Sequence, residues 1–317
     1  MAESLRAVLA RVTTSLTQSL TQSLATSQAA LAEREETTVS PSQEARWLVS
    51  AVLGVTPAAL VHRMMEDAVL EDDAVARVDR ALARRGAGEP LAYAVGTAAF
   101  RELVLAVDRR VLIPRPETEV VVGEALRVTA DRPGGIAVDI GTGSGAIALS
   151  LACEGRFDRV IATDISSDAL DVARANAVRV AAAYPGAAPV AFVAGADLAP
   201  FDEAQPENSP LGNAHARVLV SNPPYIAYDE AGALPASVRD WEPPVALFAA
   251  EQGMARYQAL LSGAPRILEP GGWIVLELDA RRARQTAVLA EQSGFEAVQV
   301  IADLSGRERV LVARRGS

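Results

Sequence analysis

The sequence predicts an α/β fold: a mainly parallel seven-stranded sheet with helices on both faces, preceded by a small helical bundle. Three patterns predict it. From Ile136 onward, short apolar runs of strand length alternate with helical patterns, which is typical of parallel strands joined by crossover helices. Up to Arg85, apolar residues recur at helical spacing instead. Two final apolar runs, Val298–Ile301 and Val310–Ala313, flank a tight turn at Asp303–Glu308 and indicate an antiparallel pair.

Residues 1–85 are predicted to form the helical bundle. Leucine and valine recur every three or four residues from Leu5 to Leu24, which indicates a first helix containing a duplicated TQSL segment. Because residues 1–36 are also rich in Ser and Thr, an ordered helix, a mobile segment and a targeting peptide all stay open for them. Further helices are expected from Ser40 to Gly54, from Thr56 through Met65, and from about Asp72 to Arg85.

Residues 86–111 are predicted to be a β-hairpin linker, because Gly86 and Gly88 break the helical pattern and apolar residues then alternate. Residues 112–317 hold the α/β domain. Its strands are expected at Ile136–Ile140, Val160–Thr163, Val190–Val193, Val218–Ser221 and Trp273–Leu278, with helices up to Ala152, from Ser167, up to Leu268 and after Leu278, besides the final pair. The polar stretch 202–215 is expected to be a mobile loop.

The charge balance excludes one class of partner. The 317 residues carry 30 Arg and no Lys against 40 acidic side chains, a net charge of −10. Residues 1–85 hold 11 acids and 9 Arg (net −2), and residues 86–317 hold 29 acids and 21 Arg (net −8). Proteins that bind duplex nucleic acid neutralise phosphates with cations, so stable nucleic-acid binding is not expected. A basic protein or a small molecule is the partner that this charge favours.

Cysteine and histidine content excludes two kinds of structural site. With Cys153 as the one cysteine, no internal disulfide framework is possible, and a reducing compartment is expected. His62 and His215 form no Cys/His cluster, so no metal site is expected. No apolar run reaches the roughly 18–20 residues that cross a bilayer. We therefore expect a soluble, cytoplasmic protein without membrane contact, and a monomer.

A glycine-rich loop, Gly141-Thr142-Gly143-Ser144-Gly145, follows the first strand of the sheet and opens a helix. Glycines there let a ligand approach the backbone, and a helix N-terminus favours an anionic group. Asp164 ends the next strand, where it can accept hydrogen bonds from ribose hydroxyls. The loop fits the dinucleotide fingerprint, S-adenosylmethionine (AdoMet) and a purely structural turn, and it does not choose among them.

The tetrapeptide Asn222-Pro223-Pro224-Tyr225 directly follows the strand Val218–Ser221, at the edge where α/β folds bind ligands. It resembles the [DNS]-P-P-[YFW] motif of AdoMet-dependent amino-methyltransferases. An amide nitrogen is a poor nucleophile because its lone pair is delocalised. The Asn222 side-chain oxygen and the Pro223 carbonyl can accept its two N–H bonds, and Tyr225 can cover the flat group. Such a site would work by orientation and electrostatics, without a strong base.

Longer blocks extend this pattern from about Ser40 to the C-terminus. In chain order they are Glu89–Tyr93, Gly96 with Phe100, Leu112–Thr118, Asp139–Ala152, Ala162–Leu170, Val220–Ile226, Arg239–Pro243, Gly253 with Tyr257, and Leu268–Gly272. In order and spacing they resemble the HemK/PrmC family of peptide chain release factor glutamine N5-methyltransferases. That resemblance implies a class I AdoMet-dependent methyltransferase fold, with the helical domain recognising the protein substrate.

The resemblance also implies a reaction and a site. The methyl group of AdoMet would pass to the glutamine N5 in the Gly-Gly-Gln motif of class-one release factors, leaving S-adenosyl-L-homocysteine. AdoMet contacts are implied at Gly141, Thr142, Gly143, Ser144, Gly145, Asp164, Asp197, Leu198 and Asn222. The substrate glutamine would lie against Asn222–Tyr225, with Arg115, Glu117 and Phe100 lining the same pocket. From the residues alone, Arg115 and Glu117 fit a structural ion pair equally well, and Phe100 fits a packed core position better.

The sequence departs from the family pattern in three places. Leu198 stands where the family usually has an aromatic residue, and Glu277-Leu278-Asp279-Ala280-Arg281-Arg282 replaces Glu-x-Gly-x-x-Gln. The N-terminal segment and the loop before His215 are longer than expected. None of these departures touches the glycine loop or the Asn222–Tyr225 motif.

Three other functions compete with this interpretation. An adenine-N6 methyltransferase acting on DNA or RNA would use the same motif chemistry, but it needs a basic groove, and the acidic balance disfavours it. A dinucleotide-dependent oxidoreductase leaves Asn222–Tyr225 unexplained. A catalytically inactive AdoMet-binding module would not need that motif.

Overall fold

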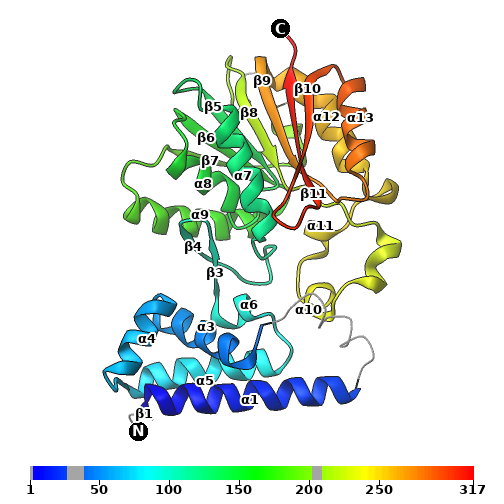
Figure 1. The fold of residues 1–317 in the computed structure, drawn as a ribbon. Coiled ribbons are helices and arrows are strands. Elements are labelled where there is room, and N and C mark those ends of the chain that lie inside the picture. Colours follow the sequence, from blue (N-terminus) through cyan, green and yellow to red (C-terminus); the bar gives the residue numbers. More distant parts are fainter. Residues whose placement is uncertain (1–2, 27–38, 202–208) are drawn as a thin grey trace. The chain divides into compact units, whose positions relative to one another are not determined.

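The computed structural model describes residues 3–26, 39–201 and 209–317, and the chain divides into two compact units (Figure 1). The first unit comprises Met1–Thr97 and Ala233–Trp241, and the second comprises Ala98–Gly232 and Glu242–Ser317. The division falls inside the predicted linker 86–111. It also assigns a short segment from the C-terminal half of the sequence to the helical unit.

The first unit is built mainly from helices, and α1, α3, α4 and α5 share one apolar core. Its elements are β1 (Glu3–Ser4), α1 (Leu5–Thr26), α3 (Pro41–Leu53), α4 (Pro57–Met65), β2 (Val69–Leu70), α5 (Asp72–Gly86), α6 (Leu91–Val95) and α10 (Ala236–Arg239). β1 and β2 pair antiparallel. The core takes one stripe from each long helix, including Leu5, Leu48, Leu60 and Val78, as the helical spacing predicts.

Helix ends in this unit follow from side-chain capping. The Ser40 hydroxyl accepts a hydrogen bond from the Gln43 amide at 3.3 Å, and the Thr56 hydroxyl accepts one from the Ala59 amide at 3.1 Å. Gly54 ends α3 in the left-handed region with φ 64°. The predicted helices at 40–54 and 56–65 are confirmed. No single described helix is long and apolar enough for a membrane span, although α3 and α4, bent by 94°, pass that test as a pair.

The second unit contains a seven-stranded sheet with the order β10-β11-β9-β8-β5-β6-β7. Its strands are β5 (Ile136–Ile140), β6 (Arg159–Asp164), β7 (Val190–Ala194), β8 (Ala216–Ser221), β9 (Leu268–Glu277), β10 (Phe295–Ala302) and β11 (Glu308–Arg315). β9, β8, β5, β6 and β7 run parallel, and β11 and β10 add an antiparallel edge. The predicted mainly parallel sheet with a final antiparallel pair is confirmed.

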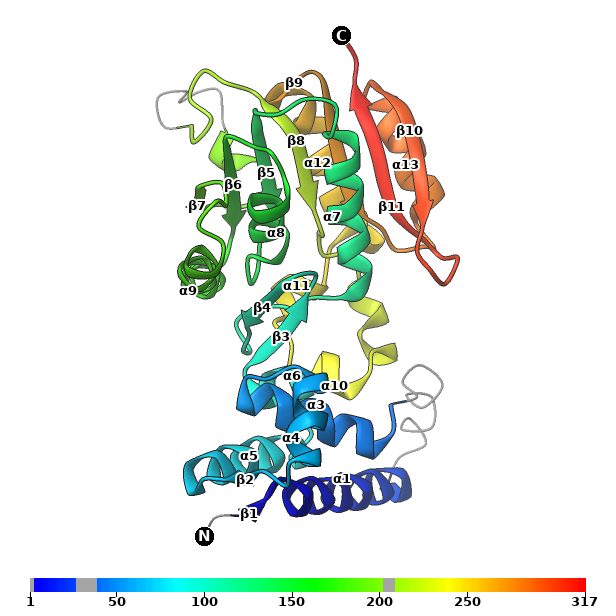
Figure 2. The same cartoon turned by 60° about the vertical axis from the view of Figure 1, so that its left-hand side comes forward.

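Helices cover the two faces of this sheet with separate cores (Figure 2). The covering helices are α7 (Pro116–Val128), α8 (Ala146–Glu154), α9 (Ser167–Ala183), α12 (Ala255–Ile267) and α13 (Ala283–Gln292). This unit also contains the short helix α11 (Pro244–Leu247) and the 3-10 turns η1 (Ala199–Phe201), η3 (Tyr228–Ala233) and η4 (Glu251–Gly253). Adjacent strand residues alternate between faces, so Ala137 packs with α7 and α8 while Val138 packs with α12 and α13. β3 (Thr97–Phe100) and β4 (Leu103–Ala106) form a further two-stranded sheet.

Several predicted bounds need correction. The predicted hairpin linker 86–111 holds the short helix α6 before the hairpin of β3 and β4, and the strand predicted from Val298 begins at Phe295. The strand predicted from Trp273 begins at Leu268, so α12 ends at Ile267 instead of Leu268. The predicted mobile loop 202–215 lies partly outside the described residues. Its remainder, 209–215, forms a turn in which Leu211 is buried in the core on the α12 face. Burial of this apolar side chain and a hydrogen bond from Arg159 to the Leu211 carbonyl at 3.2 Å hold this part of the segment.

Candidate active site

Three parallel strands end side by side at the carboxyl edge of the sheet. The register pairs Ile140 with Thr163 on one side and with Ser221 on the other. The glycine loop therefore leaves β5 between the ends of β6 and β8. The Ser221 hydroxyl donates a hydrogen bond to the Ile140 carbonyl at 2.7 Å, which fixes the exit of β8 against the exit of β5.

The glycine loop adopts a conformation that only glycine accepts at low cost. Gly141, Gly143 and Gly145 have φ values of 76°, 54° and 86°. The amides of Gly141 and Thr142 both donate to the Thr163 carbonyl at 2.9 Å. Gly141 and Gly143 also have no described atom within 4 Å of the position that a Cβ would occupy. The loop therefore presents bare backbone at this edge.

Asp139 stabilises the glycine loop through hydrogen bonds from inside the protein. It is fully buried, and its Oδ2 accepts hydrogen bonds from the Thr142 hydroxyl at 2.6 Å and the Ala148 amide at 3.1 Å. Burial raises the pKa of Asp139 to about 7, and the two hydrogen bonds oppose this shift. The Thr142 side chain is thus committed to the support of the loop.

Asp164 connects the loops that follow β5 and β6. One carboxylate oxygen accepts from the Gly143 amide at 2.9 Å, and the other accepts from the Ser166 amide at 2.9 Å. Burial raises the pKa of Asp164, and the backbone donors oppose that shift. A carboxylate held this way retains acceptor capacity for ligand hydroxyls.

Asn176 is a structural residue of the site that no sequence motif indicated. It lies in α9 and is 1% exposed. Its Nδ2 donates to the carbonyls of Ser144 at 2.9 Å and Ala106 at 3.0 Å, and its Oδ1 accepts from the Ala106 amide at 2.7 Å. The available signal was a polar residue within the inward stripe Ala169, Ala173 and Val180, where an amide needs buried partners.

Asn222 lies at the start of the loop after β8, and its amide orientation is set by neighbours. Its Nδ2 donates to the Thr118 hydroxyl at 3.1 Å, and Thr118 donates to Glu277 Oε2 at 2.5 Å. Thr118 and Glu277 are 4% and 2% exposed. Burial raises the pKa of Glu277 to about 7. Neither residue was assigned a role of its own from the sequence.

One cavity brings together the loops at this edge. Seven of the predicted site residues line it: Gly141, Gly143, Asp164, Asp197, Asn222, Pro223 and Pro224. Residues without a predicted role also line it, among them Arg110, Leu112, Ile165, Val245 and Arg256. Arg256 pairs with Asp197. Among the residues that the structure describes, no three His, Cys, Asp or Glu side chains gather as they would around a metal ion.

The other predicted site residues do not line this cavity. Thr142, Ser144 and Gly145, the other three residues of the glycine loop, are buried. Phe100 is 1% exposed and belongs to the core beside α7 and α8. Arg115 forms a structural ion pair, but its partner is buried Glu242 and not the Glu117 named with it from the sequence. Tyr225 packs on the core of the α12 face, where burial raises the pKa of its hydroxyl. Glu117, in the first turn of α7, is half-buried.

Comparisons with known proteins agree with this geometry. A family model, the PrmC N-terminal domain, matches residues 22–96. The release factor glutamine methyltransferase of Cereibacter sphaeroides is 38% identical over 86% of this chain and 91% of its own length. That of Moorella thermoacetica is 39% identical over 87% and 92%. The chain belongs to the release factor glutamine methyltransferase family. The predicted HemK/PrmC resemblance is confirmed.

A structural comparison bears on the fold of this family member. The hMettl16 catalytic domain, solved in complex with the MAT2A 3'UTR hairpin 6, matches with a TM-score of 0.50 at 15% identity. The match covers 79% of this chain and 85% of the other. The class I methyltransferase fold is confirmed.

Two departures of this methyltransferase from its family pattern have structural explanations. The Leu198 side chain packs against α12 at Gly263, where a Cβ would lie 2.5 Å from the leucine Cδ1. Leu198 does not line the cavity. Because Gly263 has no side chain, Leu198 can pack against the core on the α12 face of the sheet.

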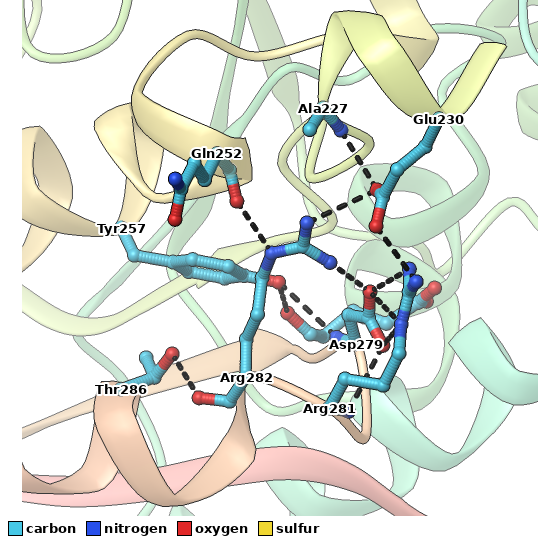
Figure 3. Close-up of polar contacts among 9 residues, drawn as sticks. Ala227, Glu230, Gln252, Tyr257, Asp279, Arg281, Arg282 and Thr286 are labelled. Carbon is cyan, nitrogen blue, oxygen red and sulfur yellow. Dashed lines mark hydrogen bonds and ion pairs between the residues drawn. The ribbon is translucent and has the colours of Figure 1, made fainter.

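The second departure, Asp279–Arg282, forms an ion-pair cluster at the end of β9 (Figure 3). Arg282 pairs with Asp279, and its guanidinium also donates to Glu230 Oε2 at 3.0 Å and to the Gln252 carbonyl at 2.7 Å. Glu230 in turn accepts from the Ala227 amide at 3.0 Å. The cluster thus ties the segment after Asn222–Tyr225 to the η4 turn and to the sheet.

Proposed function

We propose that the protein transfers the methyl group of AdoMet to the glutamine N5 in the Gly-Gly-Gln motif of class-one peptide chain release factors, leaving S-adenosyl-L-homocysteine. Family membership supports the reaction class. The observation that carries the proposal is the joint lining of one cavity by the bare glycine loop, Asp164, and Asn222 with both prolines of its motif.

The cavity residues fit AdoMet. The backbone at Gly141 and Gly143 leaves open the space that a Cβ would fill, and it lies before the N-terminus of α8, which favours a carboxylate. Asp164 supplies carboxylate oxygens for ribose hydroxyls, and exposed Ile165 beside it offers an apolar surface. When bound, AdoMet supplies a methyl group activated by a positively charged sulfur.

The Asn222 motif is suited to hold a primary amide. Since Asn222 donates an Nδ2 proton to the Thr118 hydroxyl, its carbonyl oxygen lies on the other branch of the planar amide and is left to accept. The Pro223 carbonyl offers a second acceptor on a backbone whose φ the ring restricts. Two fixed acceptors bind both N–H groups of a glutamine and aim its nitrogen lone pair, so orientation supplies the catalysis.

The partner and the compartment complete the proposal. A class-one release factor is the protein substrate, and the first unit of the chain recognises it. The net charge of −8 over residues 86–317 complements a partner that binds ribosomal RNA. We place the protein in the cytoplasm, as a monomer without stable nucleic-acid binding.

Mass spectrometry of a purified release factor, incubated with the protein and AdoMet, tests the function. One added methyl group on the glutamine of the Gly-Gly-Gln peptide is the expected result. A release factor in which that glutamine is replaced by glutamate is the matched control and stays unmodified. Duplex DNA and RNA are assayed in parallel. Methylation of adenine in either, with an unmodified release factor, would overturn the proposal in favour of the adenine-N6 alternative.

A further inference from the structure

We propose that Glu277 and Thr118 are positioning residues: together they dictate which face of the Asn222 amide is presented to the substrate. The inference rests on the proposed function, because it assigns a cause to the acceptor role of Asn222. It follows from the direction of two consecutive hydrogen bonds, Asn222 to Thr118 and Thr118 to Glu277.

The number of protons available to each group fixes the direction of these two hydrogen bonds, which we call the relay. An ionised carboxylate only accepts, and a threonine hydroxyl has a single proton. At 2.5 Å, the bond from Thr118 to Glu277 Oε2 has the length of a charge-assisted hydrogen bond and takes that proton. Thr118 therefore offers only a lone pair to Asn222. The asparagine must turn its NH₂ group toward Thr118, and its oxygen is left for the substrate.

Burial favours the hydrogen bonds of the relay over hydrogen bonds to water. Thr118 is 4% exposed and Glu277 is 2% exposed, so water has little access to replace either partner. The three residues come from separate elements: the first turn of α7, the end of β9 and the loop after β8. Tyr257 fixes the backbone behind Glu277, since its hydroxyl donates to the Glu277 carbonyl at 3.1 Å and accepts from the Asp279 amide at 3.3 Å (Figure 3).

A reversed amide would disable the site without changing its shape. The two ends of an asparagine amide are nearly equal in size, so packing alone does not distinguish them. With the NH₂ group facing the substrate, two sets of N–H donors would oppose each other, and the Pro223 carbonyl would be the remaining acceptor. The hydroxyl of Thr118 is the group that makes the productive orientation the favoured one.

Kinetics of three threonine variants test the relay. T118V keeps the side-chain shape but removes the hydroxyl, and we expect kcat for release-factor methylation to fall by roughly 10- to 100-fold with little change in AdoMet affinity. T118S restores the hydroxyl and should restore kcat. T129V is the matched control, since Thr129 is also buried, directly follows the other end of α7 and donates only to carbonyls of that helix, at 2.7 Å for Ala125 and 3.3 Å for Leu126.

A double-mutant comparison separates positioning from general damage. In an N222A background the amide that Thr118 orients is gone, so adding T118V should change kcat by no more than about twofold. Equal losses from T118V with and without Asn222 would overturn the proposal, and so would full activity of T118V. If wild-type protein leaves the release factor unmethylated, the proposed function fails, and the relay is then decided by a measurement without substrate.

That measurement is NMR of the Asn222 side-chain amide. The sequence holds four asparagines, so labelling with ¹⁵N-asparagine gives four NH₂ pairs, and the pair missing in N222A belongs to Asn222. We expect T118V and E277Q to shift this pair strongly, while T118S and T129V leave it near its wild-type position. An Asn222 pair that does not respond to T118V would show that no such hydrogen bond orients the amide.

Discussion

Gly253 lies directly against the carbonyl oxygen of Tyr225: a Cβ at Gly253 would sit 2.2 Å from that oxygen. The residue has φ 84° and ends the η4 turn, whose Gln252 carbonyl accepts from Arg282 at 2.7 Å. The last residue of the Asn222–Tyr225 motif therefore rests on a turn that the ion-pair cluster holds in place.

Replacing Gly253 by alanine should impair the motif. The added methyl group must displace the Tyr225 backbone, so we expect G253A to lower kcat at least tenfold in the methylation assay, besides a loss of roughly 1–3 kcal/mol of unfolding free energy from the left-handed backbone. G294A is the matched control, because Gly294 also has φ 84° but no described atom within 4 Å of a Cβ. It should lose stability by chemical denaturation and keep kcat. Equal kcat values for the two variants would contradict the contact argument.

Removal of the Asn222 side chain should act on turnover. One of the two acceptors for the substrate amide is lost in N222A, so kcat should fall by roughly 10²–10³, the scale for one preorganised hydrogen-bonding group. AdoMet affinity, measured by calorimetric titration, should stay nearly unchanged because the glycine loop and Asp164 are intact. Near-normal turnover would refute the role of Asn222.

Removal of the Asp164 carboxylate should act on the cofactor first. D164A loses the acceptors for the ribose hydroxyls, and it also frees the Gly143 and Ser166 amides that now bind this carboxylate at 2.9 Å. We expect AdoMet affinity to fall roughly 10- to 100-fold, with a smaller effect on kcat at saturating AdoMet. A calorimetric titration that gave wild-type affinity would exclude Asp164 from the binding site.

Local sequence signals predicted most of the fold and seven of the residues that line the cavity. These signals depend on residues that are close together in the chain, so the sequence alone displays them. They include the helix caps at Ser40 and Thr56, the alternation after Ile136 and the turn before Val310. The glycine loop and the Asn222 motif were found for the same reason. Both need particular residue types at consecutive positions.

Contacts between distant segments were not predictable in this way. Thr118 and Glu277 are 159 residues apart, and nothing in the sequence around either residue indicates that they form a hydrogen bond. Asn176 binds a strand 70 residues before it. The position of Leu198 depends on a missing side chain at Gly263. Such contacts are set by packing of the whole unit, which a single sequence does not display.

The same packing predicts how activity depends on pH. Burial raises the pKa of Glu277 to about 7; the hydrogen bond from Thr118 opposes the shift, Glu117 adds to it, and Arg309 and Arg115 oppose it. Below this pKa, Glu277 is protonated and becomes a donor. Thr118 can then accept from Glu277 and donate to the oxygen of Asn222, which reverses the amide. Methyl transfer should therefore be lost as the pH falls.

For one group with pKa near 7, kcat should drop roughly tenfold between about pH 8 and about pH 6. E277Q cannot titrate at this position, so its kcat should be lower than that of wild type near pH 8 and should vary little over the same range. Burial also raises the pKa of Asp139 to about 7, and Asp139 is unchanged in E277Q. The pH profile of E277Q therefore measures how much Asp139 contributes to the pH dependence of kcat. An E277Q profile that still fell tenfold would assign the pH dependence to Asp139 and the glycine loop instead of the relay.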